Sequence, residues 1–300
     1  MKSGFVGIVG RPNVGKSTLM NTILGEKIAI TTDKPQTTRN TIRGIYTRFD
    51  EEQEPACQLV FIDTPGIHKP HNKLGSYMTQ SAINTFNEVE MILFLVDSPY
   101  TGEGSGDDYI LNLLKEVKTP KILVINKIDT LDPEEFKATF QTYEEMGLFD
   151  HVMGVCAKDG KNVDRLLAAI EEKMSEGPMF FPPEMITESP ERFLVSEIIR
   201  EKLLLYLEEE VPHGVAVEIE SYTEEPQLTS ISAVIYCEKQ SHKGIIIGRE
   251  GRKLKGIGKA ARVEIEALLG TKVFLQTHVK VKERWRENDI AIKNFGYKEG

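Results

Sequence analysis

A glycine-rich loop near the start of the chain has the residues needed to hold a polyphosphate. The stretch Gly10-Arg-Pro-Asn-Val-Gly-Lys-Ser17 follows the apolar run Phe5–Val9, which predicts a strand, and leads into a helix that begins near Gly15. In such a loop, backbone N–H groups point at the phosphates, and the positive end of the helix favours the same anion. We expect Lys16 to reach the β and γ phosphates and the Ser17 hydroxyl to bind Mg²⁺. The loop residues expected to contact the nucleotide are Gly10, Asn13, Val14, Gly15, Lys16, Ser17 and Thr18.

Three further polar segments each follow a predicted strand, in the order that a GTP-binding domain requires. They are Asp63-Thr-Pro-Gly66 after Cys57–Ile62, Asn126-Lys-Ile-Asp129 after Lys121–Ile125, and Cys156-Ala-Lys158 after Val152–Val155. Open α/β sheets bind their ligands at the carboxyl ends of parallel strands. We therefore expect all three segments to line the same site as the phosphate loop.

The second and third of these segments indicate guanine as the base. The Asp129 carboxylate can accept both the N1–H and the exocyclic N2–H of guanine, a pair of donors that adenine lacks, and such charge-assisted bonds are strong. We expect Asn126 to tie this segment to the phosphate loop, Lys127 to lie along the base plane, and the backbone N–H of Ala157 to meet the guanine carbonyl. Cys156 and Lys158 complete the expected nucleotide-binding set.

The segments GRPNVGKSTLMN, PQTTRN, DTPGIHKP and NKID, with the Ala-Lys pair, resemble the translation-factor-class GTPases of the Era family over the full length of the chain. Cys156 is a departure, because the family usually has Ser there. The resemblance implies that Thr38, in the loop Thr31–Ile42, ligates Mg²⁺ in the GTP state, with Thr37 as the alternative. It also implies that Asp63 holds a Mg²⁺-bound water and that the Gly66 N–H senses the γ-phosphate.

The residue after Gly66 bears on the rate of hydrolysis. Ras-like proteins have a Gln at this position, which orients the attacking water, whereas this chain has Ile67. An isoleucine has no polar atom, so we expect slow intrinsic turnover that depends on Lys16, Thr38 and Gly66. His68 is a candidate replacement base, although a His in a loop is more often simply solvated.

Asn13 allows a sharper hypothesis. In related GTPases an Asn at this position of the phosphate loop helps to bind K⁺ between the α and γ phosphates. The alternative is that Asn13 only suits the turn, since Asn tolerates left-handed backbone conformations.

The chain of 300 residues is long enough for two domains. A seam with four prolines runs from Gly177 to Pro190. We expect a GTP-binding domain over residues 1–177, a linker over 178–190 and a second domain over 191–300. Strands alternate with helices before the seam, which predicts an α/β P-loop GTPase fold with a doubly wound, mostly parallel sheet.

After the seam, the order of predicted elements changes. A helix over Glu191–Glu210 precedes strands over Val215–Ser221 and Thr229–Glu238; a helix over Arg252–Leu269 and a strand over Lys272–Val281 follow. With a short helix before Gly248-Arg-Glu-Gly251, the order is α-β-β-α-α-β. This resembles an α+β KH domain of type-II topology, whose GxxG loop lets a nucleic-acid backbone approach closely. A glycine-capped helix–loop–helix turn is the alternative.

Charge favours the KH interpretation. Residues 239–286 hold 13 Lys and Arg against 4 Asp and Glu, whereas the whole chain carries a net charge of −9. A basic segment in an acidic protein is typical of a nucleic-acid contact, and a KH groove prefers single-stranded RNA. We expect Trp285 to pack under the last helix, with base stacking as the alternative. The expected RNA-binding residues are Lys243, Ile247, Gly248, Arg249, Gly251, Arg252, Lys253, Lys280 and Lys282, and Lys255 is a further cation expected beside the loop.

Composition and the longest apolar run bear on the cellular compartment of the protein. The longest apolar run, Met91–Val96, is too short to cross a bilayer, the first residues lead directly into the phosphate loop and leave no room for a signal peptide, and the three scattered cysteines fit a reducing compartment. We expect a cytoplasmic monomer, in part peripheral on the inner face of the cell membrane.

These features together indicate a GTP-operated RNA-binding switch that uses Mg²⁺, with K⁺ as a candidate second ion. The family resemblance implies that its partners are the small ribosomal subunit and the 3′ end of small-subunit ribosomal RNA, and that it assists subunit assembly. Two alternatives stay open. One is a membrane-peripheral regulatory GTPase with weak attachment to anionic lipid, and the other is a constitutive RNA-binding assembly factor whose GTPase domain is only structural.

Overall fold

The computed structural model describes residues 1–297 and divides into two compact units. The first unit comprises residues 1–31, 38–71 and 75–188, and the second comprises residues 32–37, 72–74 and 189 onward. Residues 298–300, the end of the expected second domain, lie outside the described residues.

A six-stranded sheet forms the centre of the first unit, with the strand order β2-β3-β1-β4-β5-β6. All neighbouring strands are parallel except β2 and β3, which are antiparallel. This confirms the expected doubly wound, mostly parallel sheet. The strands are β1 (Lys2–Gly10), β2 (Ile42–Phe49), β3 (Pro55–Asp63), β4 (Met91–Val96), β5 (Lys121–Ile125) and β6 (His151–Gly154).

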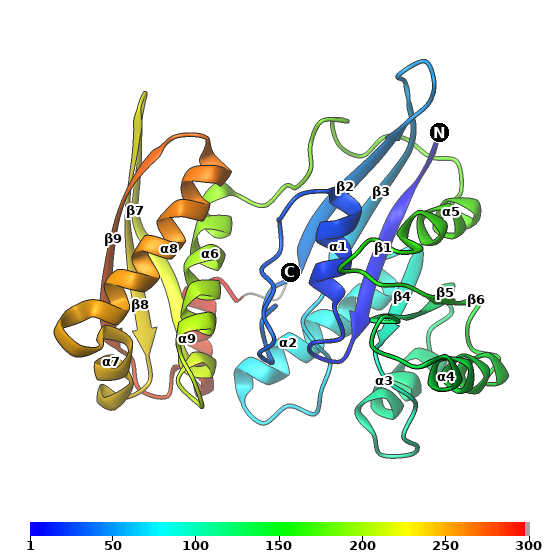
Figure 1. The fold of residues 1–300 in the computed structure, drawn as a ribbon, viewed down its shortest axis with the longest axis horizontal. Helices are drawn as coiled ribbons and strands as arrows, with labels where there is room; N and C mark the ends of the chain where they lie inside the picture. The colour runs from blue at the N-terminus through cyan, green and yellow to red at the C-terminus, as the bar shows by residue number, and fades with distance from the viewer. Residues whose placement is uncertain (298–300) are drawn as a thin grey trace. The chain divides into compact units, whose positions relative to one another are not determined.

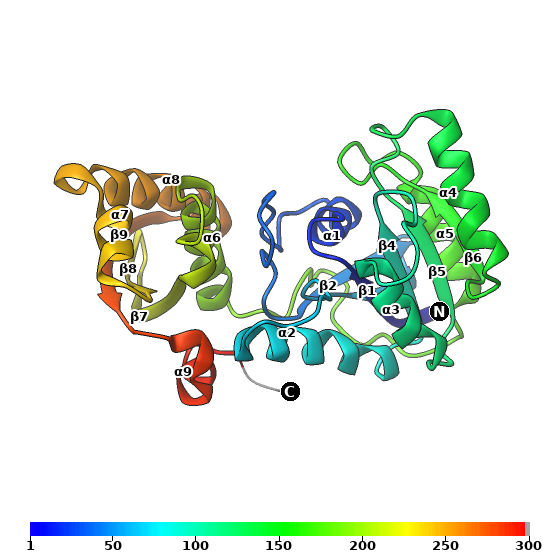
Figure 2. The same ribbon diagram turned by 90° about the horizontal axis from the view of Figure 1, so that it is seen from below.

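Helices cover both faces of this sheet, and α1 and α2 lie on opposite sides of it (Figure 2). Strand β4, with the sequence MILFLV, is buried at every position, as a central parallel strand covered on both faces must be. On one face, residues of α2, α3 and α4 share a core with Phe94 and Leu123. The helices are α1 (Lys16–Leu24), α2 (Lys73–Asn84), α3 (Gly106–Lys115), α4 (Pro133–Glu145) and α5 (Val163–Lys173).

The second unit has the expected α-β-β-α-α-β order around a three-stranded sheet (Figure 1). Strands β7 and β8 are antiparallel, and β8 and β9 are parallel. Helix α8 buries Ile257, Ala261 and Ile265, spaced by four residues, against the sheet. The elements are α6 (Glu191–Tyr206), β7 (Ala216–Glu225), β8 (Leu228–Cys237), α7 (Gln240–Ile247), α8 (Arg252–Leu269) and β9 (Lys272–Val281), followed by a short α9 (Asp289–Asn294).

Two expectations for this unit are settled by the structure. Helix α6 ends at Tyr206, four residues before the predicted end, because Leu207 is extended and buried in the core. Trp285 is fully buried; its Nε1–H donates to the Gly214 carbonyl at 2.9 Å and its ring meets Phe295, just after α9, edge to face. The indole therefore packs beneath the C-terminal segment and is not available to stack on a base.

The segment expected as a linker is anchored to the first unit up to Glu188. The N–H of Ile45 in β2 donates to the Ile186 carbonyl at 2.7 Å, and Thr187 Oγ1 donates to the Arg43 carbonyl. Further back, the side chain of buried Gln58 accepts from the N–H groups of Phe180 and Phe181. The proline-rich segment thus lies along the β2 and β3 side of the sheet.

Among the described residues, no helix combines the length and the apolar character that a membrane crossing requires.

Gln58 is the main polar anchor of this segment, since its amide also donates to the Phe181 carbonyl at 2.8 Å. We predict that Gln58→Ala lowers the free energy of unfolding of the first unit by about 1–3 kcal/mol, because two backbone donors lose their acceptor. Hydrogen exchange at Phe180 and Phe181 should accelerate. Gln80→Ala is the control, because the exposed Gln80 amide donates to Asn84 and not to the proline-rich segment as far as the described residues show. Equal exchange in the two variants would contradict the prediction.

Candidate nucleotide site and nucleic-acid groove

The phosphate loop joins the end of β1 to the start of α1, as the sequence predicts. Gly15 caps the helix and Lys16 is its first residue. Lys16 is 5 % exposed, and its Nζ donates to the carbonyls of Arg11 at 2.9 Å and Gly10 at 3.3 Å. Burial lowers the pKa of Lys16 to about 8, although Asp63 opposes the shift. An ammonium group held in this way, within a loop at a helix N-terminus, fits a phosphate group.

Three side chains from three separate segments meet beside Lys16. Ser17 Oγ donates to Asp63 Oδ2 at 2.6 Å, Thr38 Oγ1 lies 2.9 Å from Ser17 Oγ, and Thr38 Oγ1 donates to the same carboxylate oxygen at 3.3 Å. The other oxygen, Asp63 Oδ1, is buried and has no hydrogen-bond partner among the described residues. Two hydroxyls and a carboxylate with an unsatisfied oxygen are a donor set that suits Mg²⁺.

The structure distinguishes the two candidate threonines. Only Thr38 faces Ser17 and Asp63, because Thr37 Oγ1 is turned toward its own loop, where it donates to the Lys34 carbonyl and lies 2.6 Å from Thr32 Oγ1. The geometry therefore favours Thr38 as the magnesium ligand.

Burial controls the charge of Asp63. Its complete removal from solvent raises its pKa to about 6, and Lys16, Ser17 and Thr38 only partly offset the shift. The carboxylate thus needs cations and donors around it to stay ionised, and Mg²⁺ supplies such charge when it is bound.

The base-reading segments contact the phosphate loop directly. Asn126 Nδ2 donates to the Val14 carbonyl at 2.8 Å, which is the tie expected from the sequence. Asn126 Oδ1 accepts from the Ala157 N–H at 2.9 Å, so this N–H, expected to meet the guanine carbonyl, is bonded to Asn126 here. Lys127 Nζ donates to the Asn13 carbonyl at 2.8 Å. Asn126 thus joins the loop to both base-reading segments.

Asp129 and Lys158 are exposed, whereas Cys156 is buried beneath them. A hydrogen bond with the Cys156 thiol is the main cause that lowers the pKa of Asp129. Burial raises the pKa of Cys156, so the thiol stays protonated and can donate. In the geometry of the structure, the single thiol proton is directed to Asp159, with Sγ 3.4 Å from Oδ2. The cysteine, unusual for the resembled family, therefore places a protonated thiol beside two carboxylates, those of Asp129 and Asp159.

The segment after Asp63 offers no polar side chain at the position that orients the attacking water in Ras-like proteins. Ile67 is completely buried, and its N–H donates to the Gly10 carbonyl at 3.1 Å, which holds the neighbouring Gly66 beside the phosphate loop. His68 is half-buried, with Nδ1 3.0 Å from the Lys69 carbonyl. Asn13 has an exposed side chain and a φ of 65°, a left-handed conformation that Asn tolerates better than most residues.

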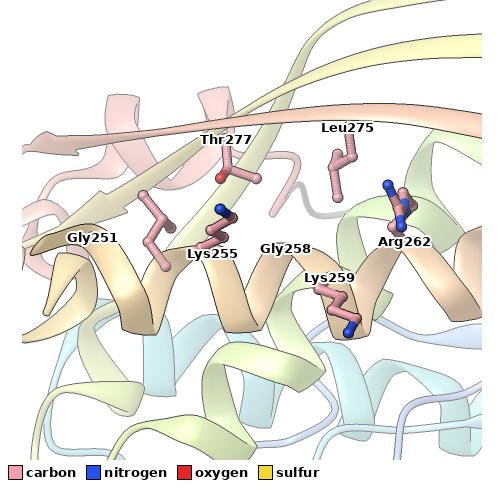
Figure 3. A pocket seen from close by; sticks show the side chains of 8 residues that line it. Gly251, Lys255, Gly258, Lys259, Arg262, Leu275 and Thr277 are labelled. Atoms are coloured by element: carbon pink, nitrogen blue, oxygen red, sulfur yellow. The ribbon is translucent and has the colours of Figure 1, made fainter.

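A second site lies in the other unit, between α8 and β9 (Figure 3). A groove of about 430 Å³ is open beside the GxxG loop, and its cationic lining consists of Lys255, Lys259 and Arg262 from α8. Leu275 and Thr277 line the opposite wall from β9. A shallow, partly apolar trough with cations along one rim suits unstacked bases and a phosphate backbone.

The GxxG loop has the backbone that its glycines allow. Gly248 has φ 72° and Gly251 has φ 74°. A Cβ on Gly248 would come within 2.7 Å of the Lys253 Cβ, whereas one on Gly251 would meet no atom within 4 Å. Gly251 also lines the groove. The first glycine is needed for packing and the second keeps the mouth of the groove open.

Sequence comparisons agree with this division into two sites. The model of the 50S ribosome-binding GTPase family matches residues 5–127, and the KH domain model matches residues 210–286. The GTPase Era of Clostridioides difficile is 56% identical over 299 residues, which cover 99% of this chain and 98% of that protein. The GTPase Era of Alkaliphilus metalliredigens is 54% identical over 300 residues, with 99% of each chain covered. The chain belongs to the Era family of GTPases. It is therefore an enzyme that hydrolyses GTP.

Solved structures of Era share the whole fold. A variant of Aquifex aeolicus Era bound to GDP.AlF4⁻ and an Era protein in complex with MgGDPNP and nucleotides 1506–1542 of 16S ribosomal RNA both superpose with a TM-score of 0.93. Each is 36% identical to this chain, with 100% of both chains covered. Era proteins thus hold guanine nucleotides, in one case with Mg²⁺, on this same fold.

The structure separates the expected RNA-binding residues of this Era-family chain into two groups. Ile247, Gly248, Arg249, Gly251, Arg252 and Lys253 surround the GxxG loop, with Lys243 on the preceding helix α7. Lys280 lies on the other face of the sheet, because side chains alternate along β9 and Leu275 and Thr277 take the groove face. Lys282 follows the last residue of β9, and its Nζ lies over the Tyr236 ring, 5.8 Å from the ring centre. Lys280 pairs with Glu220 at 3.6 Å, and Lys282 Nζ lies 4.7 Å from the centre of the Phe295 ring.

Two groove cations, Lys259 and Arg262, are absent from the residues expected at the RNA site, whereas Lys255 was expected beside the loop. The three cations lie at intervals of four and three residues along α8, so the helical periodicity of the basic residues was the available signal.

We predict that Thr38→Ala reduces Mg²⁺-dependent GTP hydrolysis by about tenfold or more, the effect expected when a metal site loses a supporting oxygen. The measurement is phosphate release across a Mg²⁺ titration, in which the rate of Thr38→Ala should rise less with Mg²⁺ than the rate of the wild type. Thr37→Ala is the matched control and should stay within about threefold of the wild type, a change of less than 1 kcal/mol. A larger loss in Thr37→Ala than in Thr38→Ala would show that the register is wrong.

Proposed function

We propose that this chain is a GTP-operated switch that binds the 3′ end of small-subunit ribosomal RNA through its KH domain and assists assembly of the small ribosomal subunit. The observation that carries the proposal is the basic groove beside the GxxG loop, on the fold that an Era protein uses in its complex with 16S ribosomal RNA. On this proposal the protein acts in the cytoplasm, as a monomer.

The nucleotide site is proposed to work by positioning and charge. Lys16 stabilises the negative charge that develops on the γ-phosphate, and the Gly66 N–H senses the γ-phosphate. Ser17 and Thr38 would ligate Mg²⁺, and Asp63 would hold a Mg²⁺-bound water. Mg²⁺ supplies charge neutralisation of the phosphates when it is bound. Buried Ile67 offers no polar atom to the attacking water, so intrinsic turnover is slow. The Asp129 carboxylate selects guanine over adenine.

The groove is proposed to hold single-stranded RNA. Leu275 and Thr277 offer a surface for unstacked bases, and Lys255, Lys259 and Arg262 meet the phosphates on the α8 side. A KH domain clamps about four nucleotides at its GxxG loop and reads unstacked bases, which a continuous duplex does not offer. The coupling of the two sites must be reciprocal: if GTP tightens RNA binding, RNA tightens GTP binding equally.

A lipid surface is the competing partner for the same cations. The cationic helix α8 is amphipathic, but its apolar stripe of Ile257, Ala261 and Ile265 is used in the core. A helix that inserts into a membrane surface keeps such a face free. The cations around the groove therefore favour RNA over anionic lipid.

We predict that crosslinking in the host cell captures the 3′ region of small-subunit ribosomal RNA on the wild-type protein and that Gly248→Asp/Gly251→Asp loses this RNA. Two carboxylates at the GxxG loop would repel the phosphate backbone. Sequencing of the captured RNA is the measurement.

Lys280→Ala/Lys282→Ala is the control for loss of charge alone, since it removes two cations from the other face of the sheet. It should retain capture. Diffuse capture, or capture unchanged by the glycine substitutions, would contradict the RNA proposal, and binding of the glycine variant to anionic vesicles without RNA capture would favour the membrane alternative.

We further propose that Asn13 contributes to a K⁺ site. GTP turnover should then be several-fold faster in KCl than in NaCl at equal ionic strength. Asn13→Gly keeps the positive φ accessible and removes the side chain, so it should abolish the difference between the salts. Equal wild-type rates in the two salts would leave Asn13 with its turn-forming role alone.

A further inference from the structure

Asp97 is an acidic residue that none of the nucleotide-binding motifs contains, yet it lies in the nucleotide site. It follows directly after Val96, the last residue of β4, on the central strand between β1 and β5. Strand β1 leads into the phosphate loop and β5 leads into the base-reading segment at Asn126. Asp97 therefore stands at the strand end between the two halves of the pocket. Its side chain is 20% exposed.

The two carboxylate oxygens of Asp97 are divided between the two halves. Oδ1 accepts from Nη2 of Arg11 in the phosphate loop at 3.2 Å, and Oδ2 accepts from Nζ of Lys127 at 2.7 Å. Lys127 Nζ also donates to the Asn13 carbonyl, so the same ammonium group contacts the phosphate loop a second time. One carboxylate thus joins two cations that belong to opposite ends of the site.

Arg11 is fixed from its other side by α3. Its Nε donates to Asp107 Oδ1 at 2.8 Å, and its Nη2 donates to Ser98 Oγ at 2.9 Å. Asp107 lies in the first turn of α3 and is 4% exposed. The packing is close, because a Cβ on Gly106 would come within 2.7 Å of the Arg11 Cδ. The guanidinium therefore has little freedom to follow Lys127 if the pocket loosens.

We propose that Asp97 is a positioning residue for the bound nucleotide, setting the spacing between the phosphate loop and the base-reading lysine. Without its negative charge, Arg11 and Lys127 would face each other as like charges and separate. Lys127 would then lose its position along the base plane, and the phosphate loop would lose one of its charged ties. The neutral tie through Asn126 to Val14 would stay.

The test is the rate at which a fluorescent GDP or GTP analogue leaves the protein, measured by stopped flow with Mg²⁺ present. Asp97→Asn should raise both dissociation rates about tenfold, or about 1.4 kcal/mol, while the melting temperature of the nucleotide-free protein changes little. Because Asp97 acts through Arg11, Arg11→Gln and Asp97→Asn should be non-additive, and the double variant should dissociate little faster than Asp97→Asn alone. Asp97→Glu should recover part of the loss, since it keeps the charge.

Asp108→Asn is the matched control. Asp108 is the next residue to Asp107, but its carboxylate accepts from Tyr100 Oη and the Gly104 N–H. Among the described residues, no hydrogen bond links this carboxylate to the phosphate loop or to Lys127. Its dissociation rates should equal those of the wild type. If Asp97→Asn does not fold, Arg11→Lys tests the same network, because a lysine cannot reach Asp97 and Asp107 together and should raise the rates several-fold.

Dissociation rates of Asp97→Asn within twofold of the wild type would overturn the proposal. So would strictly additive effects of the Arg11 and Asp97 substitutions, or an equal acceleration in Asp108→Asn, which would indicate general loosening of the loop after β4. In the absence of a folded Asp97→Asn protein, unchanged rates in Arg11→Lys would overturn it.

Discussion

The constraint on which the nucleotide site depends is the burial of a carboxylate next to a buried ammonium group. Asp63 is removed from solvent with one oxygen lacking a partner among the described residues, and Lys16 beside it donates only to backbone carbonyls. Burial raises the pKa of Asp63 and lowers the pKa of Lys16, so it favours the neutral form of each group. Charged groups in such a place are stable only when opposite charges surround them. A polyphosphate with Mg²⁺ would supply both signs of charge at once.

The sheet explains how such charges are assembled. The neighbouring strands β3, β1, β4 and β5 are parallel and end at the same edge. Each carries a different functional group past that edge: Asp63, the phosphate loop, Asp97 and Asn126. The loop that carries Thr38 closes the remaining side and continues into β2, where Arg43 and Ile45 contact residues 186–188. Strand β2 therefore connects the loop that meets Asp63 with the segment that leads to the second unit.

Much of the site could be predicted from the sequence because its motifs are contiguous. The phosphate loop, Asp63 and Asn126 each follow an apolar run at a fixed distance, and strand ends share an edge in a parallel sheet. The choice between Thr37 and Thr38 could not be made, since adjacent residues differ only in the direction that the loop gives them. Asp97 could not be recognised, because a single acidic residue after a strand has no signature until its partners from residues 11 and 127 are seen.

In the KH domain, the elements could be predicted from the sequence but the placement of the cations around the groove could not. Its order of elements and the strand Lys272–Val281 were predicted correctly, because the helical and alternating patterns there are strong. The positions of its cations relative to the groove required knowing which face of β9 meets α8. Net charge located the basic segment, but the alternation of side chains along β9 is needed to separate Lys280 from the groove residues, and the contacts of Lys282 with the Tyr236 and Phe295 rings are needed to place that residue.

The central claim is that the nucleotide state controls RNA binding, and the most direct measurement is the affinity for an RNA with the sequence of the 3′ end of small-subunit ribosomal RNA. Fluorescence anisotropy would compare a non-hydrolysable GTP analogue with GDP. The account predicts binding at least about fivefold tighter with the GTP analogue, the lower end of common coupling energies, and loss of this difference in Thr38→Ala. Equal affinities in the two nucleotide states of the wild-type protein would contradict the account and favour a constitutive RNA-binding factor.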